Sequence, residues 1–98
     1  MNKGKADLFK ALSDENRLTI IELLIKGEMC GCTLIQKLPI SQPTLSYHMN
    51  FLAKTGLVTF RKDGTWKKYT VDRTKLSLLS EYLDNLNNDP VAGDQLPI

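Results

Sequence analysis

The stretch from Ser41 to Gly56 constrains the fold most, because it carries the marks of one short helix with two different faces. Ser41 can cap the helix, Pro43 suits its first turn, and Gly56 suits the left-handed position that closes a helix. Three apolar residues recur at i, i+4 and i+7, namely Leu45, Met49 and Leu52. This spacing predicts a helix with one face packed on a core.

The opposite face of this helix is polar and carries no formal charge before Lys54. A solvated helix face is usually rich in Lys and Glu, whereas short polar groups that both donate and accept hydrogen bonds are suited to reading base edges in the major groove. We therefore predict a DNA-recognition helix. Its predicted base-reading residues are Gln42, Thr44, Ser46, Tyr47 and His48. An ordinary solvated face is the alternative, and the basic segment that follows favours DNA.

A basic β-hairpin is predicted directly after this helix. Residues 57–62 alternate, Asp63-Gly64 is a two-residue turn signal, and residues 65–71 return as a second strand. Such a hairpin is a wing, and four basic residues flank its tip: Arg61, Lys62, Lys67 and Lys68. They are placed to meet phosphates or the minor groove, although lysines also protect exposed strand edges. We expect the wing aromatics Trp66 and Tyr69 to pack on the core rather than to stack on bases.

Three shorter helices are predicted before the recognition helix. The first covers residues 3–12, and the second is capped by Ser13 and ends at Gly27. The third covers residues 33–38 and is terminated by Pro39. The third helix and the recognition helix together form a predicted helix-turn-helix, in which the second helix reads the DNA.

A last helix is predicted over residues 74–86, where leucines recur at a spacing of three to four. This narrow apolar seam suits a partner helix, although it could instead close the core of a single chain. A chain of 98 residues buries a modest core, so we expect a homodimer. The predicted dimer interface contains Leu8, Leu76, Leu79, Leu83 and Leu86.

Together these elements predict a mainly α fold with a small β-hairpin. It is a winged helix-turn-helix in the order α-α-α-α-β-β-α, with one domain over residues 1–86 and a disordered tail over 87–98. The net charge of +2 is unevenly spread, since residues 41–73 hold six basic and two acidic residues. That basic segment favours a polyanionic partner, here double-stranded operator DNA.

Other classes of protein lack support in the sequence. No apolar run approaches membrane-spanning length and no signal peptide is visible, which predicts a cytoplasmic protein with no membrane partner. There is one histidine, no glycine-rich phosphate loop, and no set of nucleophile, base and orienting residue. We therefore predict that the chain is not an enzyme and requires no cofactor.

Two cysteines, Cys30 and Cys32, are separated by Gly31 alone. A disulfide across so small a ring is expected to be strained, and a reducing cytosol disfavours it, so we predict a pair of free thiols. Soft thiolates select soft, thiophilic ions. Residues i and i+2 of a regular helix point about 200° apart, so both can grip one ion only where the backbone is non-helical. Gly31 makes such a backbone accessible. Inert buried cysteines and redox-sensing thiols are the alternatives.

At this point the sequence resembles the ArsR/SmtB winged-helix metalloregulatory repressors over about residues 6–86. The matching stretches are Ala11-Leu-Ser-Asp-Glu-Asn-Arg17-Leu, Glu28-Met-Cys-Gly-Cys32, Ser41-Gln-Pro-Thr-Leu-Ser-Tyr-His48 and Gly56-Leu-Val through Asp63-Gly-Thr-Trp-Lys-Lys-Tyr69. Within the family, the Cys-x-Cys before the third helix is similar to that of the arsenic-responsive repressors.

The resemblance implies a homodimeric repressor on a palindromic operator that trivalent arsenic or antimony releases. By motif match, the metalloid ligands are Cys30 and Cys32, while Ile35 stands where some relatives have a third cysteine. Ligation would reshape the entry to the third helix and so move the reading helix. The alternatives are a repressor of the same fold that senses oxidants or reactive sulfur, and a winged-helix protein-interaction module that does not bind DNA.

Overall fold

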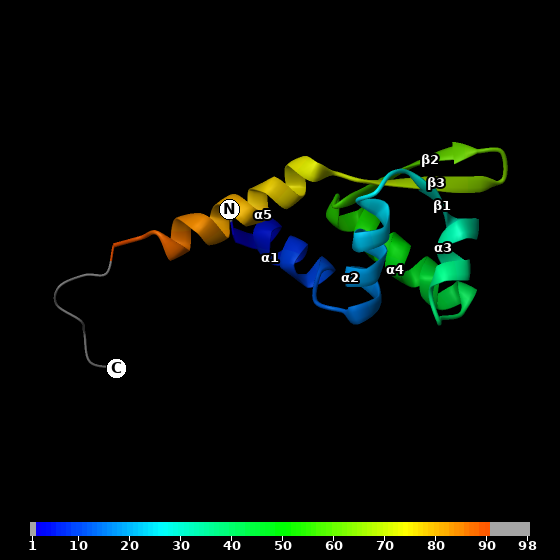
Figure 1. Cartoon of the computed structure of the whole chain (residues 1–98), viewed down its shortest axis with the longest axis horizontal. Helices are drawn as coiled ribbons and strands as arrows, with labels where there is room; N and C mark the ends of the chain where they lie inside the picture. The colour runs from blue at the N-terminus through cyan, green and yellow to red at the C-terminus, as the bar shows by residue number, and fades with distance from the viewer. Residues whose placement is uncertain (1, 91–98) are drawn as a thin grey trace.

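The computed structural model describes residues 2–90, which form five helices and one antiparallel three-stranded sheet (Figure 1). The elements are α1 (Asn2–Ala11), α2 (Glu15–Leu24), β1 (Met29–Cys30), α3 (Gly31–Lys37), α4 (Gln42–Thr55), β2 (Val58–Asp63), β3 (Trp66–Val71) and α5 (Arg73–Asn87). This confirms the predicted mainly α fold with a small hairpin, and adds one strand to it.

The recognition helix α4 begins and ends where its sequence predicts. The Ser41 hydroxyl accepts a hydrogen bond from the Thr44 N–H at 3.3 Å, and Pro43 lies in the first turn. Gly56 ends the helix with a φ of +82°, in the left-handed region that a residue with a side chain rarely adopts. Local capping chemistry therefore fixes both ends of α4.

The cap of α2 differs from the prediction by one residue. The Asp14 carboxylate, and not the Ser13 hydroxyl, accepts the hydrogen bonds of the first-turn N–H groups, from Asn16 at 2.8 Å and Arg17 at 3.1 Å. Ser13 instead donates its hydroxyl to the Lys10 carbonyl, at 2.7 Å. Either a serine or the aspartate after it can cap a helix N-terminus. Here Asp14 caps α2, and Ser13 binds a carbonyl at the end of α1.

The sheet has the strand order β1-β3-β2, so the wing hairpin carries a third strand on the β3 side. In this register, Met29 pairs with Tyr69 and Cys30 pairs with Lys68. A strand of two residues is too short to show alternation, so the sequence did not predict it. The hairpin turn is also shifted by one residue, because Asp63 pairs with Trp66 and leaves Gly64 and Thr65 as the loop. Gly64 has a φ of +66°, as the first position of a type II′ turn requires.

The core lies between the helices and the inner face of the sheet. Its fully buried large residues are Ile20, Leu24, Leu34, Met49, Leu52, Leu57 and Val58. The predicted apolar face of α4 is confirmed, since Leu45, Met49 and Leu52 are all buried. Tyr69 packs in the core as predicted, but the prediction for Trp66 is wrong, because half of its side chain is exposed.

Helix α5 runs beside α1 and extends away from the winged domain (Figure 1). Leu8 and Leu79 are buried where these helices meet within one chain, so placing them in a dimer interface is wrong. Leu76 is partly buried against the same core, whereas Leu83 and Leu86 are 51% and 56% exposed. Only the outer half of the seam is therefore open to a partner.

Helix α5 ends at Asn87, one residue beyond the expected domain boundary. Residues 91–98, most of the expected tail, lie outside the described residues. Among residues 2–90, no helix combines the length and the apolar character needed to span a bilayer.

Candidate nucleic-acid interface and thiol site

The exposed face of α4 brings together most of the predicted base-reading residues. Gln42, Ser46 and Asn50 follow one another at i, i+4 and i+8, and all three are exposed. Thr44 is also exposed and accepts a hydrogen bond from the Ser41 hydroxyl at 2.9 Å. Tyr47 is 63% exposed. This face is uncharged, concentrated in polar groups and free of core contacts, as a reading face requires.

His48 does not share this face, so placing it among the base-reading residues is wrong. Its side chain is buried, with Nδ1 3.2 Å from the Arg17 guanidinium and Nε2 3.8 Å from the Asp14 carboxylate. Since a guanidinium only donates hydrogen bonds, Nδ1 accepts here. One residue after Tyr47, the helix has turned about 100°, which carries His48 to the inner side.

Arg17 is the positioning residue that the sequence interpretation missed. It is 9% exposed, donates to the carbonyls of Ala11 (3.0 Å) and Lys10 (3.2 Å), and lies over the Phe51 ring at 4.5 Å. It thus joins the end of α1 to two residues of α4. The sequence does indicate that Arg17 faces the core, because it stands at helical spacing from the buried residues Ile20, Ile21 and Leu24. A charged residue on a core face requires partners inside the protein.

Two of the four predicted basic residues of the wing are paired with carboxylates of the same chain. Arg61 donates two hydrogen bonds to Glu28, each 2.8 Å long, and Lys68 lies 2.9 Å from Asp63. The Arg61 hydrogen bond lowers the pKa of the Glu28 carboxyl, and the Lys68 hydrogen bond lowers the pKa of Asp63. Both carboxylates are therefore charged at neutral pH.

The other two basic residues are differently placed. Lys67 lies over the Phe60 ring with its Nζ 4.5 Å from the ring centroid, and it is partly buried. Lys62 is exposed on β2. The wing therefore presents Lys62 directly, whereas a phosphate would have to compete with Glu28 for Arg61.

The two cysteines are joined by a disulfide, so the prediction of free thiols is wrong for this state of the protein. Cys30 has an extended backbone, with φ −69° and ψ 145°, and it caps α3, while Cys32 lies in the first turn of that helix. The non-helical backbone turns both side chains to the same side, with the Cα atoms 5.2 Å apart. That separation falls within the ordinary range for a bridge. The Cys32 N–H also donates to the Cys30 sulfur, at 3.2 Å.

In the described part of the chain, the cysteine pair is not joined by a third metal-binding side chain. Within residues 2–90, no group of three or more His, Cys, Asp or Glu side chains could hold one ion.

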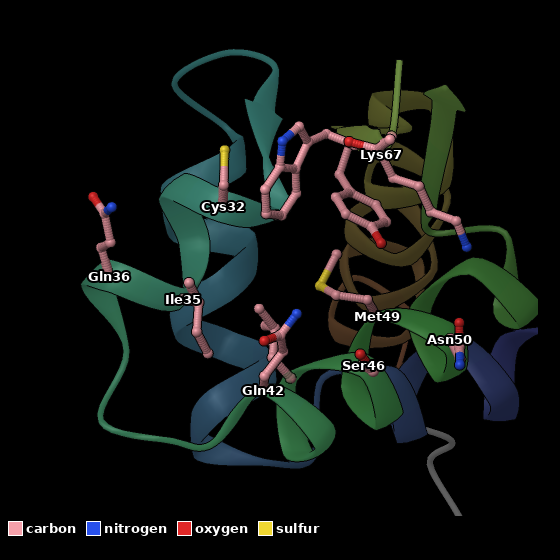
Figure 2. A pocket seen from close by; sticks show the side chains of 13 residues that line it. Cys32, Ile35, Gln36, Gln42, Ser46, Met49, Asn50 and Lys67 are labelled. Atoms are coloured by element: carbon pink, nitrogen blue, oxygen red, sulfur yellow. The ribbon is translucent and has the colours of Figure 1, made fainter. Parts of the chain in front are cut away.

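A cavity of about 600 Å³ separates α3, α4 and the outer end of β3 (Figure 2). Cys32 and Ile35 of α3 border it on one side, and Gln42, Ser46 and Met49 of α4 border it on the other. Trp66 contributes to its lining from the wing. The cavity thus lies between Cys32 and the reading face of α4.

Known proteins are similar to this chain in sequence. The model of the arsR family of bacterial regulatory proteins matches residues 14–59, which run from the cap of α2 into β2. An arsenical resistance operon repressor of Staphylococcus xylosus is 41% identical over 85 residues, covering 87% of this chain and 82% of the relative. The chain belongs to the arsR family. A helix-turn-helix transcriptional regulator of Methanocaldococcus jannaschii is 42% identical, covering 83% of this chain and 92% of the relative.

The fold agrees with that assignment. An ArsR-like transcriptional regulator from Rhodococcus sp. RHA1 superposes with a TM-score of 0.81 at 29% identity, over 88% of this chain and 79% of that one. As a member of the arsR family, the protein is a DNA-binding transcriptional repressor and not an enzyme, which confirms both predictions. Family membership identifies the kind of partner.

Proposed function

We propose that this arsR-family repressor leaves its operator when trivalent arsenic or antimony binds the reduced thiols of Cys30 and Cys32. The observation that carries the proposal is the convergence of the two sulfurs at the start of α3. Once reduced, the same backbone presents two soft thiolates toward one point, as a thiophilic ion needs. The arsenical resistance operon repressor among the relatives supports the choice of ion.

The thiols are connected to the wing, and so to DNA, through the sheet. Cys30 is a strand residue paired with Lys68 of β3, and Glu28, two residues before it, accepts two hydrogen bonds from Arg61 of β2. A change at Cys30 therefore alters the sheet that carries the basic wing residues. The same change acts on α3, which precedes α4 in the chain. Because coupling is reciprocal, operator DNA should weaken metalloid binding by the same factor.

The DNA contacts that we propose follow from exposure. Gln42, Thr44, Ser46 and Tyr47 would read bases, and Lys62, Lys67 and the paired residues Arg61 and Lys68 would meet the backbone. If a dimer neutralises about six phosphates, log K should fall against log salt with a slope near −5. A salt-independent affinity would instead indicate a protein-interaction module.

We also propose a homodimer built on α5. Leu78, and Leu83 and Leu86 in its outer half, are between 39% and 56% exposed, and apolar residues gathered on a helix surface need a partner. Two copies would place two recognition helices on the two halves of a palindromic operator.

The test is a mobility-shift titration of the reduced protein on its own upstream DNA, with and without arsenite. Cys30→Ser and Cys32→Ser should bind DNA like the native protein and stay bound in arsenite. Thr33→Val is the matched control, because it changes the neighbouring residue and keeps both thiols, and it should remain inducible. Release of both serine variants by arsenite would refute the thiol site.

The disulfide favours one second candidate, a repressor that senses oxidants through the same pair. In that case, formation of the Cys30–Cys32 bond would itself change the affinity for DNA. Comparing peroxide-oxidised protein with reduced protein, in the absence of metalloid, separates the two. If only the metalloid releases DNA, the disulfide is a protected form of the arsenic site. If oxidation alone releases DNA, the redox reading is correct.

A further inference from the structure

His48, the only histidine of the chain, is buried directly behind the proposed reading residue Tyr47. The two rings meet edge to face, with their centroids 5.4 Å apart and an angle of 63° between their planes. Tyr47 is exposed, whereas His48 faces the interior. The His48 ring therefore packs against a side chain that reaches the outer face of α4.

Two charged groups face the His48 ring, one at each nitrogen. The Arg17 guanidinium, from α2, donates to Nδ1 at 3.2 Å. The Asp14 carboxylate, at the cap of α2, lies 3.8 Å from Nε2, which is too far for a hydrogen bond. The end of α1 contributes the carbonyls of Lys10 and Ala11, and Arg17 binds both. Within residues 2–90, the ring forms no hydrogen bond or ion pair with another charged side chain, including those of β2, which also packs on α4.

These surroundings suit the neutral ring and not the protonated one. Because a guanidinium only donates, Nδ1 carries no proton, so the neutral ring holds its proton on Nε2, on the side of Asp14. Protonation places a second donor and a second positive charge against Arg17. Asp14 attracts the charged ring, but it is more distant, partly exposed, and already accepts the N–H groups of Asn16 and Arg17. The protonated ring therefore has to leave Arg17 and turn toward the cap of α2.

We infer that His48 is a positioning residue for operator reading, and that its protonation displaces Tyr47 and weakens operator binding in acid. The inference rests on the proposed reading role of Tyr47. Histidine is the side chain that ordinarily changes charge between about pH 5 and 8. Arg17 also lies over the Phe51 ring and binds the end of α1, so breaking its contact with His48 loosens the internal support of α4 as well.

The first measurement is the ratio of two affinities of the reduced full chain, for its upstream operator and for a random duplex. It is made at constant ionic strength between about pH 8 and about pH 5.5. Added positive charge strengthens both complexes, so the ratio isolates base reading. His48→Gln is the matched variant, because its amide oxygen can accept from Arg17 and does not titrate. It also keeps both cysteines, so any titration of their thiols appears in both proteins.

In the native protein we expect the ratio to fall about tenfold in acid, the size of one lost base contact. In His48→Gln it should stay nearly constant. Asp14→Asn keeps a capping side chain and removes the charge that attracts the protonated ring, so the fall should begin at lower pH. The Arg17 backbone N–H lowers the pKa of the Asp14 carboxyl, so the native carboxylate stays charged across the tested range.

Proton NMR of the native protein without DNA gives a second measurement that needs no variant. A single histidine makes the His48 ring signals unambiguous. The nuclear Overhauser effects between the His48 and Tyr47 rings should weaken as His48 is protonated. Those between Phe9 and Tyr82, whose rings meet between α1 and α5, are the internal control and should persist.

A native ratio that does not change with pH, or one that falls equally in His48→Gln, would overturn the inference. So would effects between the His48 and Tyr47 rings that persist through the titration. Each of these results leaves the reading role of Tyr47 standing. That role is tested separately at about pH 8, where Tyr47→Ala should lose its preference for the operator. If Tyr47→Ala keeps the preference, the reading role fails and the inference fails with it.

Discussion

The recognition helix and the wing are attached to the protein by different kinds of contact. Helix α4 buries Leu45, Met49 and Leu52 and is held from within by the buried Arg17–His48 contact. The base of the wing is also buried, at Val58, Tyr69 and Val71, but its outer part is exposed. The charged residues of that outer part form exposed ion pairs, Arg61–Glu28 with the segment before β1 and Lys68–Asp63 within the hairpin. Buried contacts are costly to break and resist salt, whereas exposed ion pairs are worth about 0–1 kcal/mol and are screened by salt.

The two kinds of contact suit two different functions, base reading and response to an effector. A reading helix must keep its side chains in register with bases, which a rigid attachment provides. A part that responds to an effector must move at small cost, which the exposed outer part of the wing allows. Cys30 belongs to β1 of the sheet that carries the wing, and Glu28, two residues before it, pairs with Arg61, so the proposed signal enters at the more easily moved region.

The largest effect should come from removing the internal support of α4. Arg17→Met would leave the Ala11 carbonyl and the His48 ring without the guanidinium donor, whereas the Lys10 carbonyl would keep its hydrogen bonds from Ser13. We expect a loss of about 2–4 kcal/mol in the free energy of unfolding, measured by urea denaturation. Lys26→Met, at an exposed site just after α2, is the control and should change stability by less than about 0.5 kcal/mol. Equal effects of the two variants would show that α4 does not depend on Arg17.

The next effect concerns base reading. Tyr47→Ala should cost about 1–3 kcal/mol in affinity for the specific operator and little on unrelated DNA, because an exposed reading residue contributes to sequence preference. Competition binding with operator and random duplexes measures the two affinities separately. An equal loss on both sequences would indicate that Tyr47 contacts the DNA backbone. It would also weaken the distinction between a helix that reads bases and a wing that binds phosphates.

Lys62→Ala tests whether the wing contributes to DNA affinity without regard to sequence. Lys62 is exposed on β2, so its loss should weaken binding to all sequences by a similar factor. It should also make the slope of log K against log salt less negative by about 1 per chain. A loss confined to one operator would mean that the wing, too, reads sequence.

The smallest change in stability should come from Glu28→Gln, because its ion pair with Arg61 is exposed. We expect little change in the free energy of unfolding, with tighter DNA binding as Arg61 is released, and a weaker response to arsenite. Glu22→Gln removes the same charge from an exposed site on α2 and is the matched control. If both variants bind DNA equally tightly, net charge and not the Glu28–Arg61 pair is responsible.

The same pair has a defined pH dependence. Arg61 lowers the folded pKa of Glu28, so the contribution of the pair is fully present above the ordinary glutamate pKa. It is lost as the pH falls through the lowered value. Native protein and Glu28→Gln should therefore converge in stability at acid pH, which denaturation curves across that range would detect.

The sequence alone determined the elements whose signals are local. The Ser41 cap, the Gly56 stop and the apolar spacing of α4 act within a few residues, and α4 formed as these signals predict. The wing was predicted from alternation and a turn glycine, with an error of one residue at its tip. The exposed polar face of α4 also followed from spacing, apart from His48.

Tertiary structure decided whatever depends on contacts between distant segments. Strand β1 exists because Met29 and Cys30 meet β3 about forty positions later, and this pairing ties the cysteines to the wing. His48 is buried because Arg17 comes to it from α2, and Leu8 and Leu79 are core residues because α1 meets α5. The cavity beside Cys32 is likewise made by three elements that no local pattern connects. Periodicity shows which face of a segment is apolar, but only the packed chain decides what that face meets.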